Sequence, residues 1–110
     1  MTTSTAPSTA PGPVGDVLRL ALVQEASGLD PAVNRARVAE LVPDGADLVV
    51  LPEAFARDFG EAGSDVSAYA EPTDGPFATA VEAAARARST TVVAGMFEAA
   101  GEAASASAGG

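Results

Sequence analysis

The stretch from Gly45 to Phe55 has the sequence Gly-Ala-Asp-Leu-Val-Val-Leu-Pro-Glu-Ala-Phe and decides the fold class of this chain. Its centre, residues 46–51, carries apolar side chains on both faces of an extended backbone, which is typical of a buried strand in a parallel sheet. Pro52 has no N–H to donate to a sheet, so it predicts the end of the strand. Glu53 therefore follows directly on the carboxyl end of a predicted buried strand.

Two further strands are predicted, one on each side of this stretch. Residues 17–23 have the sequence Val-Leu-Arg-Leu-Ala-Leu-Val, and residues 90–94 have the sequence Thr-Thr-Val-Val-Ala. Both runs have the length of strands rather than of helices. Apolar residues on both faces of the first run indicate that it is covered on both sides, as strands of a parallel sheet are.

A helix is predicted between the first two strands. Asp30 can accept hydrogen bonds from the free N–H groups of a first turn, and Pro31 suits the first helical position. Pro43 stops the helix, and Asp44-Gly45 forms the turn after it. The residues that share one face of this helix are Asn34, Val38, Leu41 and Val42.

A second helix is predicted before the third strand. The tripeptide Asp74-Gly75-Pro76 supplies its start, and Arg86 and Arg88 lie near its end, where the helix dipole favours cations. Its apolar face carries Phe77, Val81 and Ala84. The preceding residues, 54–73, are polar and without a clear period, so we expect a loop with one helical turn around residues 54–58.

The predicted order is strand, helix, strand, loop, helix, strand, which is an α/β arrangement. Helices that alternate with short buried strands indicate a parallel sheet with right-handed crossovers, and consecutive crossovers of one hand place both helices on the same face. Either Val49 and Leu51 or their neighbours Leu48 and Val50 would then form an apolar patch on the other face. Such a patch favours self-association.

One small domain accounts for the middle of the 110-residue chain. Residues 1–16 are almost entirely Thr, Ser, Ala, Pro and Gly, and residues 101–110 are Gly, Ala and Ser with one Glu. Neither segment can bury enough apolar surface to offset the entropy of ordering it, so both are predicted to be disordered tails. Residues 17–100 remain as the foldable part, with a core that is marginal by itself.

The composition excludes several classes of function. The formal net charge is −9 and all six positive charges are Arg, without a basic stripe, so nucleic-acid binding is not expected. The chain contains no Cys, His, Lys or Trp. It therefore cannot form a disulfide, a Cys or His metal site, a thiolate nucleophile or a Schiff base, and we predict no cofactor and no metal.

The sequence carries no recognisable membrane or targeting signal. No apolar run approaches the length of a membrane span. The amino terminus lacks the charged and apolar regions of a secretory signal and the Arg-rich composition of a transit peptide. We therefore expect a cytoplasmic protein that does not bind membranes.

Glu53 is the strongest candidate for a functional residue. It stands at the carboxyl end of a buried parallel strand, the edge at which open α/β sheets place their sites. An apolar wall behind this carboxylate would make it a usable proton acceptor. The alternative is a solvated acid in a strand-to-loop turn, and position alone does not separate the two.

The other polar candidates are more simply explained by structure. Asn34 lies on an apolar helix face and is expected to tie backbone segments together, and Gln24 is also expected to be structural. Glu98 occupies a strand-end position like that of Glu53 and is a weaker site candidate. Arg57 and Asp58 are expected to be solvated loop charges.

Three further residues are expected to serve in packing. Gly95 follows the third strand and is expected to permit close packing or a turn. Phe55 and Phe59 could form the wall of a pocket in a complete enzyme, but packing is the simpler role for both.

Together these segments resemble the opening of the nitrilase superfamily of carbon–nitrogen hydrolases. The resemblance runs from Val17 to Glu98, and the segment that ends in Leu51-Pro52-Glu53 is its most specific part. The order and spacing of the pieces carry it more than any one of them. These pieces are Val17–Gln24, Asn34, Gly45–Phe55, Asp74–Pro76 with the helix after it, and Thr91–Glu98.

The resemblance implies a four-layer α-β-β-α sandwich and hydrolysis of a non-peptide C–N bond in a small amide, nitrile or carbamoyl compound. Enzymes of this family use a Cys that attacks the carbon, a Glu that takes the thiol proton and later helps to activate water, and a Lys that stabilises the developing charge. Glu53 matches the Glu, as general base. No residue of this chain matches the Lys or the Cys, so the chain is expected to be inactive alone.

Beyond Glu98 the sequence departs from the family pattern. Residues 101–110 contain no β-branched or aromatic residue and do not suit a further strand. The first hypothesis is a truncated hydrolase, with the Lys and Cys encoded downstream. The alternative is a non-catalytic α/β interaction module that pairs with another chain. A nucleotide-binding βαβ unit is poorly supported, because no G-x-G-x-x-G follows the first strand.

Overall fold

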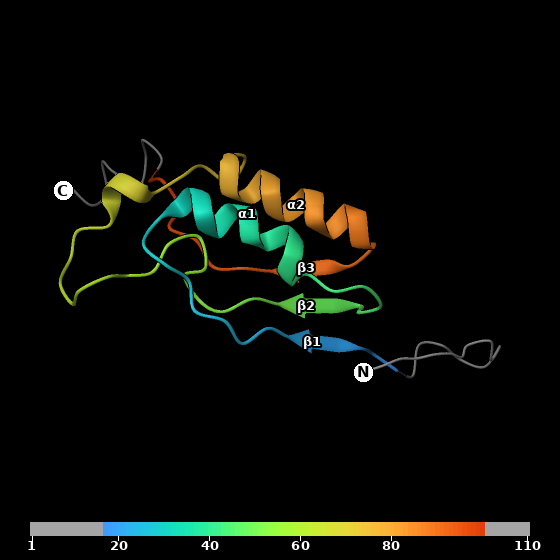
Figure 1. Cartoon of the computed structure of the whole chain (residues 1–110). Coiled ribbons are helices and arrows are strands. Elements are labelled where there is room, and N and C mark those ends of the chain that lie inside the picture. Colours follow the sequence, from blue (N-terminus) through green and yellow to red (C-terminus); the bar gives the residue numbers. More distant parts are fainter. Residues whose placement is uncertain (1–16, 101–110) are drawn as a thin grey trace.

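The computed structural model describes residues 17–100, which form a three-stranded parallel sheet covered on one face by two helices (Figure 1). The strands are β1 (Leu20–Leu22), β2 (Leu48–Val50) and β3 (Thr91–Val93), and they lie in the sheet in the order of the sequence. The helices are α1 (Pro31–Leu41) and α2 (Pro76–Arg88), and a short 3-10 helix, η2 (Ser67–Tyr69), lies in the long loop. The predicted α/β order of elements is confirmed.

The two predicted tails, residues 1–16 and 101–110, lie outside the described residues. Neither of the two α-helices in the described range has the length and apolar character that crossing a membrane requires.

The strands are shorter than the sequence predicted, with three residues each. A side-chain hydrogen bond replaces the ladder at the start of β1, whereas inter-strand bonds continue beyond β2. Before β1, the Arg19 N–H donates to the side-chain carboxylate of Asp47 at 2.8 Å rather than to a strand partner. After β2, the Leu51 N–H still donates to the Val93 carbonyl at 2.8 Å. The extended chain therefore continues to the edge of the sheet beyond β2 itself.

Helix α1 begins and packs as its sequence predicts. The Asp30 carboxylate accepts a hydrogen bond from the Ala32 N–H at 2.9 Å, and Pro31 occupies the first turn. Asn34 and Val38, both on the predicted apolar face, are the buried residues of this helix. Because the cap and the apolar face agree, local sequence and tertiary packing favour the same helix.

Helix α2 also follows the prediction, with one addition. Pro76 stands at its start, and Phe77 and Ala84 are its buried residues. The start is completed by a residue that the sequence did not single out. The Glu71 carboxylate accepts a hydrogen bond from the Phe77 N–H at 2.8 Å, placing a negative charge where the helix dipole favours one.

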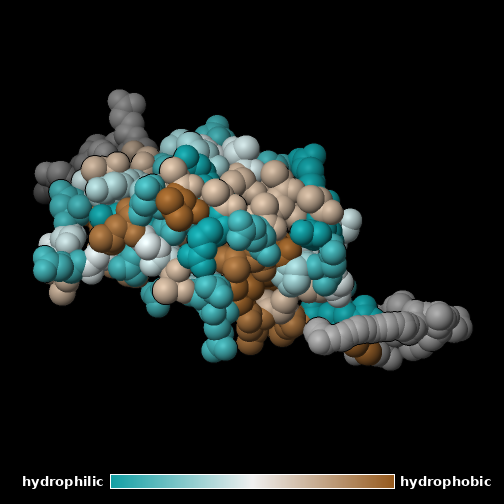
Figure 2. Space-filling view, in the orientation of Figure 1, coloured by the Kyte–Doolittle hydropathy of each residue, from teal (hydrophilic) through white to brown (hydrophobic). Residues whose placement is uncertain are grey.

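The two faces of the sheet have different surroundings. Both helices cover the same face, as predicted (Figure 1), and the central residue of β2, Val49, is fully buried beneath them. The strand register places Leu22, Val50 and Val93 side by side on the opposite face. There Leu22 is 69% exposed and Val93 is 51% exposed. Figure 2 shows apolar side chains gathered below the helices, along the sheet.

This result decides which apolar residues are left uncovered. Val49 and Leu51 are buried, so they are not part of the uncovered patch. Leu48 and Val50 lie on the open face and are half-buried. We call this surface the open sheet face. It consists of Leu20, Leu22, Leu48, Val50 and Val93.

The core lies between the sheet and the helices and is completed by the chain that follows β2. Phe55, only four residues beyond the buried Leu51, is fully buried, and it joins Val38, Val49 and Phe77 in one apolar cluster. The segment after β2 thus returns directly into the core instead of leaving as a free loop. This return fixes the position of the intervening residues, Glu53 among them.

The buried Asn34 side chain joins three segments of the chain, as the sequence predicted. It is 1% exposed. Its oxygen accepts from the Gly28 N–H at 2.9 Å, and its nitrogen donates to the Gly28 carbonyl at 2.8 Å and to the Ala56 carbonyl at 3.2 Å. Helix α1 is therefore linked both to the loop that precedes it and to the turn after β2.

We expect Asn34→Leu to lower the free energy of unfolding by about 2–3 kcal/mol, because it keeps the side-chain volume but removes the Asn34 partners of the buried Ala56 carbonyl and of the Gly28 N–H. The midpoint of urea unfolding, followed by circular dichroism, measures the effect. Glu40→Ala, at an exposed position of the same helix, is the control and should have little effect. Equal midpoints for Asn34→Leu and the wild type would contradict a structural role for Asn34.

Candidate active site

Glu53 lies where the sequence placed it, at the carboxyl edge of the parallel sheet. It begins a turn that runs from residue 53 to 56, immediately after the extended end of β2. Its side chain is exposed. The apolar wall expected behind the carboxylate is therefore not supplied by residues 17–100.

The turn after Glu53 has an unusual backbone conformation. Ala54 has a φ of 53°, in the left-handed region that residues with a side chain rarely occupy. Ala54 is nevertheless 7% exposed, so the conformation occurs in a packed environment. Its carbonyl accepts hydrogen bonds from the Ser27 hydroxyl at 3.2 Å and from the Arg57 N–H at 3.2 Å. Surrounding contacts therefore hold the turn in this form.

Gly95, which lies just after β3, packs closely against this turn. A Cβ at position 95 would lie 2.6 Å from the Ala54 nitrogen and 3.4 Å from the Glu53 Cα. The Gly95 carbonyl also accepts a hydrogen bond from the Ala56 N–H at 3.1 Å. The prediction that Gly95 permits close packing is confirmed, and the segment against which it packs is the one that carries Glu53.

Arg57 and Asp58 correct an expectation, because they are not simply solvated charges. Both are half-buried. The Arg57 guanidinium lies 3.9 Å from the centre of the Tyr69 ring and donates to the Leu29 carbonyl at 3.3 Å. The Asp58 N–H donates to the Gly28 carbonyl at 2.9 Å. These residues tie the end of the turn to the loop before α1.

The remaining polar candidates lie apart from these contacts. Gln24 and Glu98 are both exposed. The backbone of Glu98 forms an isolated parallel bridge with Glu71. The structure thus gives Glu98 a backbone role in closing the long loop, while its side chain faces solvent.

The two aromatic candidates have different environments. Phe55 is fully buried in the core, as predicted. Phe59 is 49% exposed, so its side chain is only partly packed against the protein. Its ring centre lies 5.3 Å from that of Phe97, in a tilted arrangement.

Sequence analysis missed Ser27 and Ala54. A serine in a loop and an alanine after a strand give no distinctive pattern, and the hydrogen bond between them joins residues 27 positions apart. Only the three-dimensional structure brings them together. The one available signal is indirect, namely the short distance in sequence between Pro52, which ends the strand, and the core residue Phe55.

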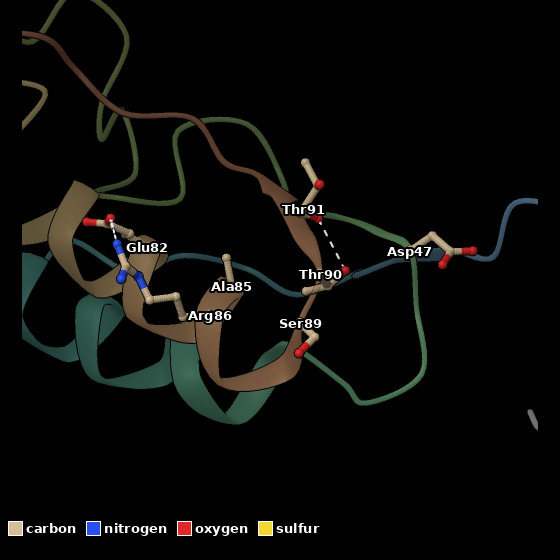
Figure 3. Close-up of a pocket in the computed structure, with 7 residues that line it drawn as sticks. All are labelled: Asp47, Glu82, Ala85, Arg86, Ser89, Thr90 and Thr91. Carbon is tan, nitrogen blue, oxygen red and sulfur yellow. Dashed lines mark hydrogen bonds and ion pairs between the residues drawn. The ribbon is translucent and has the colours of Figure 1, made fainter.

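A hollow of about 370 Å³ lies at the opposite edge of the sheet from Glu53 (Figure 3). Asp47 precedes β2 and Thr91 begins β3, so the hollow is at the amino ends of these strands. In Figure 3, Glu82 and Arg86 of α2 pair with each other along its side. This hollow is shallow and is not part of the Glu53 edge.

A second hollow, of about 530 Å³, lies between the long loop and the chain after β3. Asp65 is one of the residues that line it, and the hydrogen bond from the backbone N–H of Ser67, at 2.9 Å, lowers the pKa of the Asp65 carboxyl. Within residues 17–100, no group of three or more His, Cys, Asp or Glu side chains is arranged to hold a metal ion. The acidic residues of this region therefore do not converge on one point.

The arrangement at the carboxyl edge is suited to one chemical task. Glu53 presents an exposed carboxylate on a turn that is held by the core and by the third strand, and a carboxylate in such a place can accept or return a proton. The composition supplies no thiol and no lysine amine beside it. The described residues thus place one candidate proton acceptor at this edge.

Comparison with known proteins identifies the family. The family model described as carbon–nitrogen hydrolase matches residues 19–108. Two relatives from strains of Mycobacterium tuberculosis, hydrolase MT0498 and hydrolase Rv0480c, are each 42% identical to this chain over 89 residues. The matched region is 77% of this chain, and the chain spans 31% of the length of each relative. No solved structure matches it.

The family match agrees with the fold. The parallel sheet and the helical layer on one of its faces are the βαβαβ portion of a nitrilase-like α/β fold. The match also includes Glu53 and the turn that carries it. The resemblance found in the sequence is therefore confirmed: the chain belongs to the carbon–nitrogen hydrolase family.

Proposed function

We propose that Glu53 is the general base of a carbon–nitrogen hydrolase that acts on small amides, nitriles or carbamoyl compounds. The observation that carries this proposal is the position of Glu53, directly after a buried parallel strand and on a turn held by long-range contacts. Ligands of open α/β sheets gather at this edge. The family match supports the same reaction class.

In the proposed reaction, the Glu53 carboxylate takes the proton of a cysteine thiol as the sulfur attacks the substrate carbon. The C–N bond of an amide then breaks, and the protonated Glu53 carboxyl gives this proton to the leaving nitrogen, which restores the carboxylate. Glu53 next takes a proton from the water that releases the covalent intermediate. A lysine stabilises the negative charge that develops on the substrate. The thiol and the lysine belong to polypeptide outside this sequence, because the 110 residues contain neither Cys nor Lys.

The 110-residue chain by itself is expected not to hydrolyse amides or nitriles. Ser and Thr hydroxyls are present, but a hydroxyl nucleophile also requires an oxyanion partner and an adjacent base. Ammonia release from a panel of small amides and nitriles measures this. Turnover that disappears in Glu53→Gln would contradict the prediction.

Activity can be tested in a chimeric hydrolase in which residues 19–98 of this chain replace the matched segment of hydrolase Rv0480c. We expect Glu53→Gln to lower kcat about 10²- to 10⁴-fold, the range that general acid–base catalysis contributes. Glu61→Gln changes another exposed loop carboxylate in the same way and should leave kcat unchanged. Full activity of the Glu53→Gln chimera would refute the proposed function.

We also propose that the isolated chain associates with a second copy of itself through the open sheet face. Leu20 and Leu22 of the edge strand β1 are 53% and 69% exposed, and Val93 of the other edge strand is 51% exposed. Apolar side chains in a continuous row on a sheet favour association, and the exposed edges of β1 and β3 add unpaired backbone groups.

The chain should therefore elute from a sizing column as a dimer or a larger species at micromolar concentration. Leu22→Asp should shift it toward the monomer, because a charge on this apolar face is costly to bury. Val33→Asp makes the same kind of change at an exposed position of α1 (54% exposed), on the other side of the sheet. This control should not alter elution, and a monodisperse monomer in the wild type would argue against association.

A further inference from the structure

We propose that Ser27 and Gly95 are positioning residues that fix the place of Glu53 at the edge of the sheet by holding Ala54 in its left-handed conformation. This inference rests on the proposed role of Glu53 as general base. It assigns a function to an otherwise unexplained strained position and names the contacts that maintain it.

The first observation is the strain itself. Among residues 17–100, the non-glycine residues with a positive φ are Ala54, at 53°, and Ser89, at 51°. Ser89 caps the carboxyl end of α2, which is a common place for the left-handed conformation. Ala54 ends no helix. Strained backbone that the surroundings impose is concentrated at functional sites, and Ala54 directly follows Glu53.

The second observation is that contacts from two different segments hold this residue. From the loop before α1, the Ser27 hydroxyl donates to the Ala54 carbonyl at 3.2 Å. From the end of β3, Gly95 approaches so closely that a Cβ there would lie 2.6 Å from the Ala54 nitrogen. The Ala54 carbonyl is therefore hydrogen-bonded to Ser27, and the Ala54 nitrogen lies against Gly95. Rotation of the turn would disturb both contacts.

The third observation concerns Glu53 itself. Its side chain is exposed, and within the described part of the chain no hydrogen bond holds its carboxylate. The backbone on either side therefore sets the position of its Cα and the direction of its Cα–Cβ bond. Pro52 restricts the backbone before it, and the left-handed Ala54 sets the backbone after it. A general base must lie within hydrogen-bond reach of the proton that it takes, so a displacement of this part of the backbone should lower kcat.

Ala54→Gly separates this role from stability. Glycine adopts a positive φ without steric cost, so the folded turn is not opposed by the substitution. The turn gains freedom, however, because glycine also populates many other conformations. We expect the Tm of this variant to stay within about 4 °C of that of the wild type.

Ser27→Ala removes one hydrogen bond from the same turn. Ser64→Ala is the matched control, since the Ser64 hydroxyl donates to the Glu61 carbonyl at 2.6 Å in an exposed loop.

Two measurements test the proposal. Hydrogen exchange of residues 51–58 is followed by mass spectrometry in the 110-residue chain. It should speed up about tenfold in Ser27→Ala, which loses one hydrogen bond, and in Ala54→Gly, in which the turn gains conformational freedom. In the chimeric hydrolase, kcat should fall between about tenfold and a hundredfold in both variants, because a small displacement of a catalytic group has effects of this size. KM should change less than twofold, and Ser64→Ala should change none of these quantities.

The outcomes distinguish this inference from the proposed function. If Glu53→Gln abolishes activity but Ala54→Gly and Ser27→Ala keep the wild-type kcat, the positioning role is wrong and the general base stands. If Glu53→Gln is fully active, both are wrong. If the chimera does not fold, hydrogen exchange decides, and unchanged exchange of residues 51–58 in both variants overturns the positioning role.

Discussion

The handedness of the two crossovers is the constraint on which the rest of this structure depends. A right-handed connection between parallel strands is strongly preferred, and two of them in succession along one direction of the sheet bring both helices to the same face. The core must then form on that face, where Val49, Phe55 and Phe77 meet. The other face stays open, and the carboxyl ends of all three strands are brought to one edge.

At that edge, the chain must leave β2 and return to the core within a few residues. Leu51 and Phe55 are both buried, so the intervening turn has little room to move. The left-handed Ala54 allows the reversal, and Gly95 leaves the space that it requires. Core packing and site geometry are thus linked: the same short turn that buries an aromatic ring also presents Glu53 to solvent.

Asn34 extends this linkage to the first helix. A buried amide is costly unless its polar atoms are paired, and here each of them has a backbone partner. Because one of these partners is the Ala56 carbonyl, α1 is tied to the turn after β2 and not only to its own preceding loop. Arg57 and Asp58 add further hydrogen bonds between this turn and the loop before α1. Hydrogen bonds from several loops therefore meet at the edge that carries Glu53.

The sequence by itself determined the elements, their order and the position of Glu53. The short apolar runs, the helix starts at Asp30-Pro31 and Gly75-Pro76 and the apolar helix faces are local features. The rule of crossover handedness converts them into a one-sided sheet. The segment ending in Leu51-Pro52-Glu53 also identified the family.

Tertiary structure alone decided three other matters. It selected Leu48 and Val50, rather than Val49 and Leu51, for the open face, because the alternation of a strand gives two equivalent choices until the helices are placed. It showed Arg57 and Asp58 as ties between loops. It also brought Ser27, Ala54 and Gly95 together around the backbone of Glu53. These residues are far apart in sequence and carry no local pattern. Their relation appears only in the folded chain, where the Ser27 hydroxyl and the glycine at position 95, which has no Cβ, both contact one strained turn.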